Sequence, residues 1–197
     1  MLSKHVMEVD CFESQDIETL AGVDVTYKGN TASASCVVMD TDFSLIDQIT
    51  MKCTPRFPYM SSFFAFREFP LIYEVIKKAR FDLLFVHGHG RAHPRRFGLA
   101  CHTGMYFGKP TVGVAGQLLT GTYDTGFETY THVFDGPEII GAVLKTHPTM
   151  NPVIVSIGNM ISLESAIQYT FSAVKDHKFP EVLRRAHQVS KKALDRE

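Results

Sequence analysis

The chain has 197 residues, enough for one domain with a sizeable core, and its 45% hydrophobic and 21% charged residues are ordinary for a globular protein. The formal net charge of −1 excludes a strongly basic protein, so contacts with nucleic acid would depend on local basic clusters. No apolar run approaches the roughly 20 residues of a membrane span, the first residues lack the core of a secretory signal, and the four widely spaced cysteines favour reduced thiols in a cytoplasmic protein.

The expected single domain, residues 1–197, begins with a set of short strands joined by tight turns. The turn sequences "KGN" and "DTDF" separate strands that we expect at 21–27, 31–40 and 44–53. Apolar residues at helical spacing then predict a helix within 65–80. These elements indicate an antiparallel three-strand meander followed by a helix.

The rest of the chain alternates buried strands with helices. Nearly continuous apolar segments predict strands at 81–86, 109–116, 141–147 and 151–159. Helical patterns lie at 95–108, 162–177 and 180–197, and Ser162 is the expected N-cap of the second. A meander followed by this alternation predicts an α/β fold, with a mixed antiparallel and parallel sheet flanked by helices.

Two polar residues of the predicted strands are candidate site residues. In α/β sheets, ligands bind near the carboxyl ends of the parallel strands. Asp24 interrupts the first strand, and His87 follows the apolar run "LLFV" directly. A carboxylate in an apolar strand is costly to bury unpaired, so the alternative for Asp24 is an ion pair with a nearby Arg or Lys. For Glu68 the alternative is a local salt bridge with the adjacent Arg67.

Six segments spread over nearly the whole chain carry distinctive motifs. They read "AGVDVTYKG", "PRFPYMSSFFAFREFP", "GHGRAHPRRFGLACHTGMYFGKPTVGVA", "GAVLKTH", "VSIGNMISLESAI" and "FPEVLRRAHQVS". Together they resemble the endonuclease V family, nucleases that act next to deaminated adenine (inosine) in nucleic acid. The resemblance implies a ribonuclease H-like fold, in agreement with the mixed sheet expected above.

The resemblance implies a catalytic metal site. In the family, three carboxylates hold one or two divalent cations, which polarise the scissile phosphate and activate water. Asp24 matches the first carboxylate in G-V-D-V, and Glu68 matches the second in F-R-E. His87 stands where the family's V-D-G-H-G has the third. We therefore expect Asp24, Glu68 and His87 to form the catalytic and metal site, and to bind Mg²⁺ or Mn²⁺ weakly.

Further departures concern other polar positions of the family's site. Gly116 replaces a lysine that would contact the reacting phosphate, and Asn159 and Met160 replace a histidine and an arginine of V-S-V-G-H-R-I-S-L. Imidazole suits softer transition metals than Mg²⁺, and losing a group aimed at the transition state costs on the order of 10²–10³ in rate. These departures from the family's pattern imply that Mg²⁺-dependent cleavage is lost or strongly weakened.

Nucleic-acid contacts are expected at two turns. The family's aromatic wedge, which fills the gap left by an extruded base, corresponds to the turn that holds Tyr59 and Met60. The turn that begins at Gly88 and His89 could offer backbone N–H groups to a phosphate or a base edge.

Three arginines form the strongest basic cluster of the chain, at Arg91, Arg95 and Arg96. Guanidinium groups are well suited to phosphate contacts. The alternative interpretation of this cluster is an ordinary solvated loop.

Three functional hypotheses follow. The first is a binder of inosine-containing or structured DNA or RNA that has lost Mg²⁺-dependent cleavage, with no membrane partner. The second is an active endonuclease that uses Asp24, Glu68 and His87 with Mn²⁺ or a similar ion. The third is an enzyme or regulator with another substrate, in which His87 acts as a general base near neutral pH.

Overall fold

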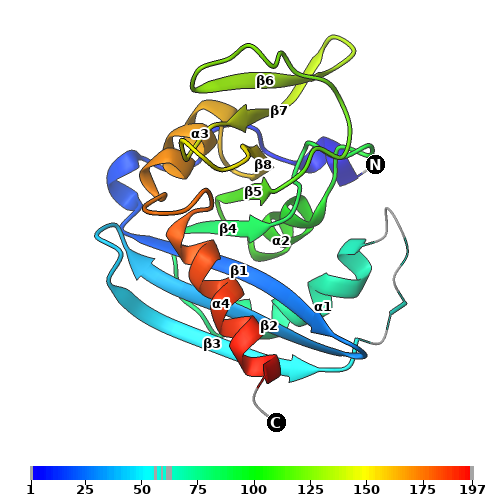
Figure 1. Ribbon diagram of the computed structural model, residues 1–197, viewed down its shortest axis with the longest axis vertical. Coiled ribbons are helices and arrows are strands. Elements are labelled where there is room, and N and C mark those ends of the chain that lie inside the picture. Colours follow the sequence, from blue (N-terminus) through cyan, green and yellow to red (C-terminus); the bar gives the residue numbers. More distant parts are fainter. Residues whose placement is uncertain (1, 56, 59, 61–63, 196–197) are drawn as a thin grey trace.

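The centre of the protein is one mixed sheet in a computed structural model that describes residues 2–55, 57–58, 60 and 64–195. Its strand order is β3-β2-β1-β4-β5-β8-β7-β6 (Figure 1). The strands are β1 (Thr19–Lys28), β2 (Thr31–Asp40), β3 (Leu45–Cys53), β4 (Leu83–His87), β5 (Thr111–Ala115), β6 (Tyr130–Asp135), β7 (Glu138–Leu144) and β8 (Val153–Asn159). β1 to β3 form an antiparallel meander, and β1, β4 and β5 run parallel. The predicted ribonuclease H-like mixed sheet is thus confirmed.

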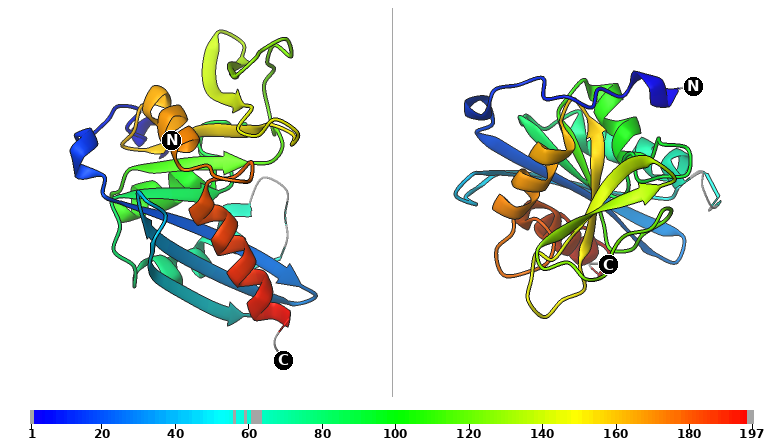
Figure 2. Two further views of the ribbon diagram at one scale, coloured as in Figure 1. Left: turned by 60° about the vertical axis from the view of Figure 1, so that its left-hand side comes forward. Right: turned by 90° about the horizontal axis from the view of Figure 1, so that it is seen from above.

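Helices cover both faces of the sheet. They are η1 (Leu2–His5), η2 (Ser14–Asp16), α1 (Phe64–Ile76), α2 (Leu99–Phe107), α3 (Leu163–Ser172) and α4 (Glu181–Asp195). α4 lies across β1 and β2 on one face, and α1 packs on the other face (Figures 1 and 2). No helix in the described part of the chain is both long and apolar enough to cross a bilayer.

The two cores explain why β2 is buried along most of its length. Successive side chains of a strand point to opposite faces. Val37 and Met39 therefore join the core under α4, while Cys36 and Val38 join the core under α1. A sheet covered on both faces accepts the uninterrupted small and apolar run that the sequence shows.

Some boundaries differ from those expected. No strand is expected at Tyr130–Asp135, but β6 pairs there with β7 at the edge of the sheet. β6 lies at the edge of the sheet and has one fully buried side chain, Val133. Its sequence therefore lacks the continuous apolar run by which the inner strands were predicted. The helix expected at 95–108 begins only at Leu99, because the backbone of Gly98 is extended.

Gly22 is the position where α4 lies closest to β1. An ideal Cβ on this residue would stand 2.3 Å from the carbonyl carbon of Val182. Gly22→Ala is therefore expected to lower the free energy of unfolding by about 2–3 kcal/mol, because backbone rather than a flexible side chain must move. Urea unfolding measures this, with Gly116→Ala as the matched control, since an added Cβ there meets ordinary contacts at 3.6 Å and 4.0 Å. Equal stability of the two variants would contradict the close packing.

Candidate active site

Asp24 and His87 meet on two neighbouring strands of the sheet, Asp24 in the middle of β1 and His87 as the last residue of β4. β1 and β4 pair in parallel with Val23 opposite Val86, so the next residues of both strands, Asp24 and His87, lie side by side. The Asp24 side chain is buried, and its Oδ1 lies 2.5 Å from Nδ1 of His87. The sequence-based prediction that these two residues come together therefore agrees with the geometry.

The other oxygen of Asp24 is held by α4 and by β1 itself. Nδ1 of His187 lies 3.0 Å from Asp24 Oδ2, and the hydroxyls of Thr26 and Ser190 donate to the same oxygen at 3.1 Å and 3.3 Å. His187 and Ser190 are three residues apart, so both side chains stand on the helix face that α4 turns to the sheet. The Arg or Lys partner considered for Asp24 is thus replaced by two imidazoles and two hydroxyls.

The imidazoles decide the charge of this cluster. Burial acting alone would raise the pKa of Asp24, but the hydrogen bonds from His187 and His87 outweigh burial and hold that pKa below its ordinary value. In turn, the hydrogen bond to Asp24 raises the pKa of His187. Asp24 is therefore held as a carboxylate, and its partner His187 on α4 favours the protonated form more than a free imidazole does.

Glu68, on α1, lines the same cavity, but its pKa is shifted in the opposite direction to that of Asp24. The side chain is buried, and this burial, together with the nearby charge of Asp24, raises the pKa of Glu68 well above its ordinary value. A proton on this carboxyl removes the negative charge that would attract a cation. Metal binding by Glu68 stays a prediction.

Asp24, His87 and His187 form the set of possible metal ligands that the structure brings together. In the described ranges, their ligand atoms all lie within 4.8 Å of one another. One carboxylate oxygen with two imidazole nitrogens is a donor set for transition metals, whereas Mg²⁺ prefers hard oxygen ligands in near-octahedral geometry. The residues therefore fit a transition metal such as Mn²⁺, Co²⁺ or Zn²⁺ better than they fit Mg²⁺.

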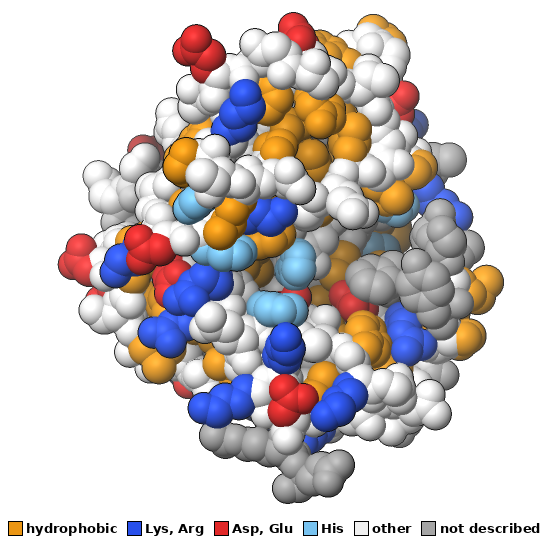
Figure 3. All heavy atoms as spheres, viewed as in Figure 1, with side chains coloured by type: hydrophobic (Ala, Val, Ile, Leu, Met, Phe, Trp, Pro, Cys, Tyr) orange, Lys and Arg blue, Asp and Glu red, His pale blue; other side chains and the backbone are white. Residues whose placement is uncertain are grey.

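A cavity of about 690 Å³ opens in front of these ligands. The polar and aromatic side chains that line it come from β1, α1, β4 and the loop after it, the segment after β5, the α3–α4 connection and α4: Asp24, Thr26, Tyr27, Glu68, His87, His89, Gln117, Lys178, Phe179 and His187. Figure 3 shows histidine side chains gathered near the middle of this face, with basic side chains close by. The volume is in the range of cavities that enclose a small ligand.

Asn159 lies far from this cavity, which corrects the expectation for that position. β8 runs antiparallel to β5, so Asn159 pairs with Thr111 at the start of β5, whereas the cavity lies beyond the end of that strand. Its amide oxygen accepts from the backbone N–H of Met7 at 3.1 Å, and its amide nitrogen donates to the carbonyl of Gly104 at 3.4 Å. Asn159 therefore does not reach the cluster of possible metal ligands, and the histidine near that cluster is His187.

Sequence reasoning missed His187 although a signal was present. It lies in the segment "FPEVLRRAHQVS", which contributes to the resemblance. Val182, Leu183, Ala186, Ser190 and Leu194 form the buried stripe of α4, and His187 borders that stripe. A histidine beside the buried stripe of an amphipathic helix could have been proposed as a partner for the buried Asp24.

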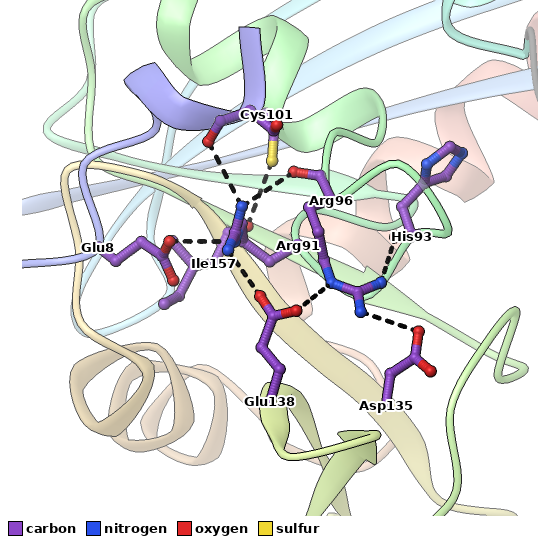
Figure 4. Close-up of polar contacts among 9 residues, drawn as sticks. Glu8, Arg91, His93, Arg96, Cys101, Asp135, Glu138 and Ile157 are labelled. Carbon is purple, nitrogen blue, oxygen red and sulfur yellow. Dashed lines mark hydrogen bonds and ion pairs between the residues drawn. The ribbon is translucent and has the colours of Figure 1, made fainter. Parts of the chain in front are cut away.

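Two arginines of the basic cluster, Arg91 and Arg96, form ion pairs with carboxylates of the protein. Arg91 contacts Glu138 at 2.9 Å and Glu8 at 3.1 Å, while Arg96 contacts Glu138 at 2.7 Å and Asp135 at 2.9 Å (Figure 4). The pairs with Glu138 and Asp135 join the loop before α2 to the β6–β7 hairpin, and the pair with Glu8 joins that loop to the N-terminal segment. The solvated-loop alternative does not describe this arrangement of Arg91 and Arg96. The phosphate contacts expected of Arg91, Arg95 and Arg96 stay a prediction.

The remaining predicted contacts fall in different surroundings. The backbone N–H of Gly88 donates to the carbonyl of Val114 at 3.0 Å, so that group is not open to a ligand. His89 lines the cavity, and Nδ1 of His89 is buried without a hydrogen-bond partner among the described residues. Burial lowers the pKa of His89 to about 4, so its imidazole is neutral at pH 7. Met60 is 47% exposed, and Tyr59 lies outside the described residues.

A mixed sheet with a meander, three parallel strands and a cluster of possible metal ligands beside them is the architecture of the ribonuclease H-like class. The family model described as Endonuclease V matches residues 1–188. The chain belongs to the Endonuclease V family.

Relatives and solved structures agree with this assignment. The chain is 39% identical to Endonuclease V of Methanopyrus kandleri over 185 residues, 92% of this chain and 81% of the relative. The crystal structure of Endonuclease V from Bacillus subtilis superposes with a TM-score of 0.92 at 30% identity, over 98% of this chain and 88% of that one. A Ciona intestinalis Endonuclease V, solved with a 24mer DNA containing an inosine followed by a ribo-adenosine, has a TM-score of 0.86 at 24% identity, over 98% and 93% of the two chains.

Proposed function

We propose that this protein binds inosine-containing or structured nucleic acid and has weak or no Mg²⁺-dependent cleavage. One observation carries the proposal: both oxygens of Asp24 accept hydrogen bonds from imidazoles, because His87 occupies the third carboxylate position and His187 closes the other side. Binding is supported by the family and by the cavity, in which an extruded base could be held.

The weak cleavage follows from charge. A carboxylate about 4 Å from a divalent cation contributes several kcal/mol even at an effective dielectric of about 20, and a neutral imidazole forfeits most of that. Mg²⁺ would also have to displace two imidazoles from Asp24, and burial, which raises the pKa of Glu68, disfavours a negative charge on that carboxyl. Each of these features weakens the binding of the cation that the reaction needs.

A gel-shift experiment tests binding. Matched oligonucleotides with inosine or adenosine at one position, each as DNA and as RNA, are titrated with the intact protein in the presence of EDTA. We expect tighter binding of at least one inosine oligonucleotide than of its adenosine counterpart. Equal and weak binding of all four would remove the proposal.

A second candidate function is an endonuclease that works with a transition metal. The observation that favours it is the approach of Asp24, His87 and His187 to within 4.8 Å of one another. Such an ion, when bound, would act as a Lewis acid on the scissile phosphate and lower the pKa of a bound water. The role of the chain is to hold it through one carboxylate and two imidazoles, oriented by Thr26 and Ser190.

Cleavage of a labelled inosine oligonucleotide in Mn²⁺, Co²⁺ or Mg²⁺ separates the two candidates. The second candidate expects product with Mn²⁺ or Co²⁺ and little with Mg²⁺. Asp24→Ala is the control, because any cleavage that survives the loss of this carboxylate comes from a contaminating nuclease. Absence of product with every ion leaves the binding protein as the function.

A further inference from the structure

Gly116 lines the cavity at a place where Lys178 and Phe179 are its nearest side-chain neighbours. It follows β5 directly, at the position where the resemblance predicts a lysine. An ideal Cβ on Gly116 would stand 3.6 Å from Cζ of Phe179 and 4.0 Å from Nζ of Lys178. The ammonium of Lys178, which comes from the connection between α3 and α4, therefore lies directly over the residue that lacks a side chain.

The backbone of Lys178 is held by a hydrogen bond, and its ammonium lies over the neighbouring Phe179 ring. The backbone carbonyl of Lys178 accepts a hydrogen bond from Oγ1 of Thr146 at 2.7 Å, and its Nζ stands 5.2 Å from the centre of the Phe179 ring. Phe179 in turn contacts the edge of the His87 imidazole, with ring centres 5.1 Å apart. The lysine is thereby linked to the residues that surround Asp24.

The charge of Lys178 is also open to a ligand. Within the described part of the chain it makes no ion pair with a carboxylate, in contrast to Arg91 and Arg96. Of the described residues that line the cavity, it is the one Lys or Arg. A fixed cation in a cavity that holds Asp24 is suited to an anion that approaches the same cluster.

We propose that Lys178 is the residue of this cavity that contacts a phosphate of the bound nucleic acid, replacing from a neighbouring loop the lysine absent at position 116. The inference rests on the proposed function, because its ligand is a phosphodiester in the same cavity. It assigns to the α3–α4 connection a direct part in substrate binding.

The experiment measures the salt dependence of inosine-oligonucleotide binding for the wild type and for Lys178→Met, which keeps an apolar stem and removes the charge. We expect Lys178→Met to weaken binding about 10-fold at low salt and to reduce the slope of log K against log salt by about 1, as loss of one phosphate contact does. Lys175→Met is the matched control. Lys175 lies on the same connection, beside the Phe43 ring at 6.0 Å, and does not line the cavity.

A rescue variant separates phosphate contact from a structural role. Gly116→Lys in the Lys178→Met background is expected to recover both affinity and slope, because position 116 has room for a Cβ and no positive φ. Normal binding with an unchanged slope in Lys178→Met overturns the inference alone, as does a loss that tracks a lower Tm and is not rescued. Failure of the wild type to bind any oligonucleotide overturns the proposed function together with it.

Discussion

Replacing His87 with aspartate is expected to raise Mg²⁺-dependent cleavage of an inosine oligonucleotide by about 100-fold. The substitution places a second carboxylate beside Asp24 and removes the imidazole that lies 2.5 Å from Asp24 Oδ1. Two neighbouring hard oxygen ligands give Mg²⁺ a site of the kind it prefers, and Asp24 is then free to bind on that side.

The same variant has a second readout in its stability. Without metal, the carboxylates at positions 24 and 87 repel each other, so the Tm of the variant should fall. Mg²⁺ should restore the Tm, because it binds to the folded state alone. His87→Asn, which is neutral, is the control and should show neither effect. A folded His87→Asp protein that cleaves no faster than the wild type in Mg²⁺ would show that His87 does not limit the reaction.

Removing His187 is expected to weaken Co²⁺ binding by about 100-fold, since the set of three ligands loses one imidazole and Asp24 loses its orienting partner. Isothermal titration calorimetry of His187→Ala measures the affinity, and the visible absorption of bound Co²⁺ reports the change in coordination. The experiment requires no nucleic acid and no catalytic activity.

His177→Ala is the matched control for this measurement. His177 stacks against the Phe179 ring near the cluster but is not one of the three ligand residues. It should bind Co²⁺ as the wild type does. If His187→Ala and the wild type bind Co²⁺ equally tightly, the cluster is a hydrogen-bonded network around Asp24 rather than a metal site.

Local patterns in the chain were sufficient for most of the sheet and for two of the three residues of the cluster. The meander followed from alternating small and apolar residues between tight turns, and the buried strands β4, β5, β7 and β8 followed from continuous apolar runs. Asp24 and His87 could be placed together because both stand near the carboxyl ends of strands that a parallel sheet makes neighbours.

His187, Asn159 and Lys178 could not be placed in the same way. Asn159 was assigned to the site because of its motif, but the antiparallel direction of β8 carries it to the opposite end of β5. His187 reaches Asp24 from 163 positions further along the chain, because α4 crosses β1 closely over Gly22. Lys178 lies just before the segment "FPEVLRRAHQVS", and no local pattern indicated that its side chain lines the cavity.

The amino-acid sequence was enough for the mixed sheet, since periodicity and turn residues are local properties that short segments express, and its motifs were enough for the resemblance to the family. The identity of the third ligand, the ion pairing of Arg91 and Arg96 and the position of Lys178 over Gly116 emerged from the folded chain. These features depend on strand direction and on the packing of α4, which bring together residues whose separation along the chain no local pattern encodes.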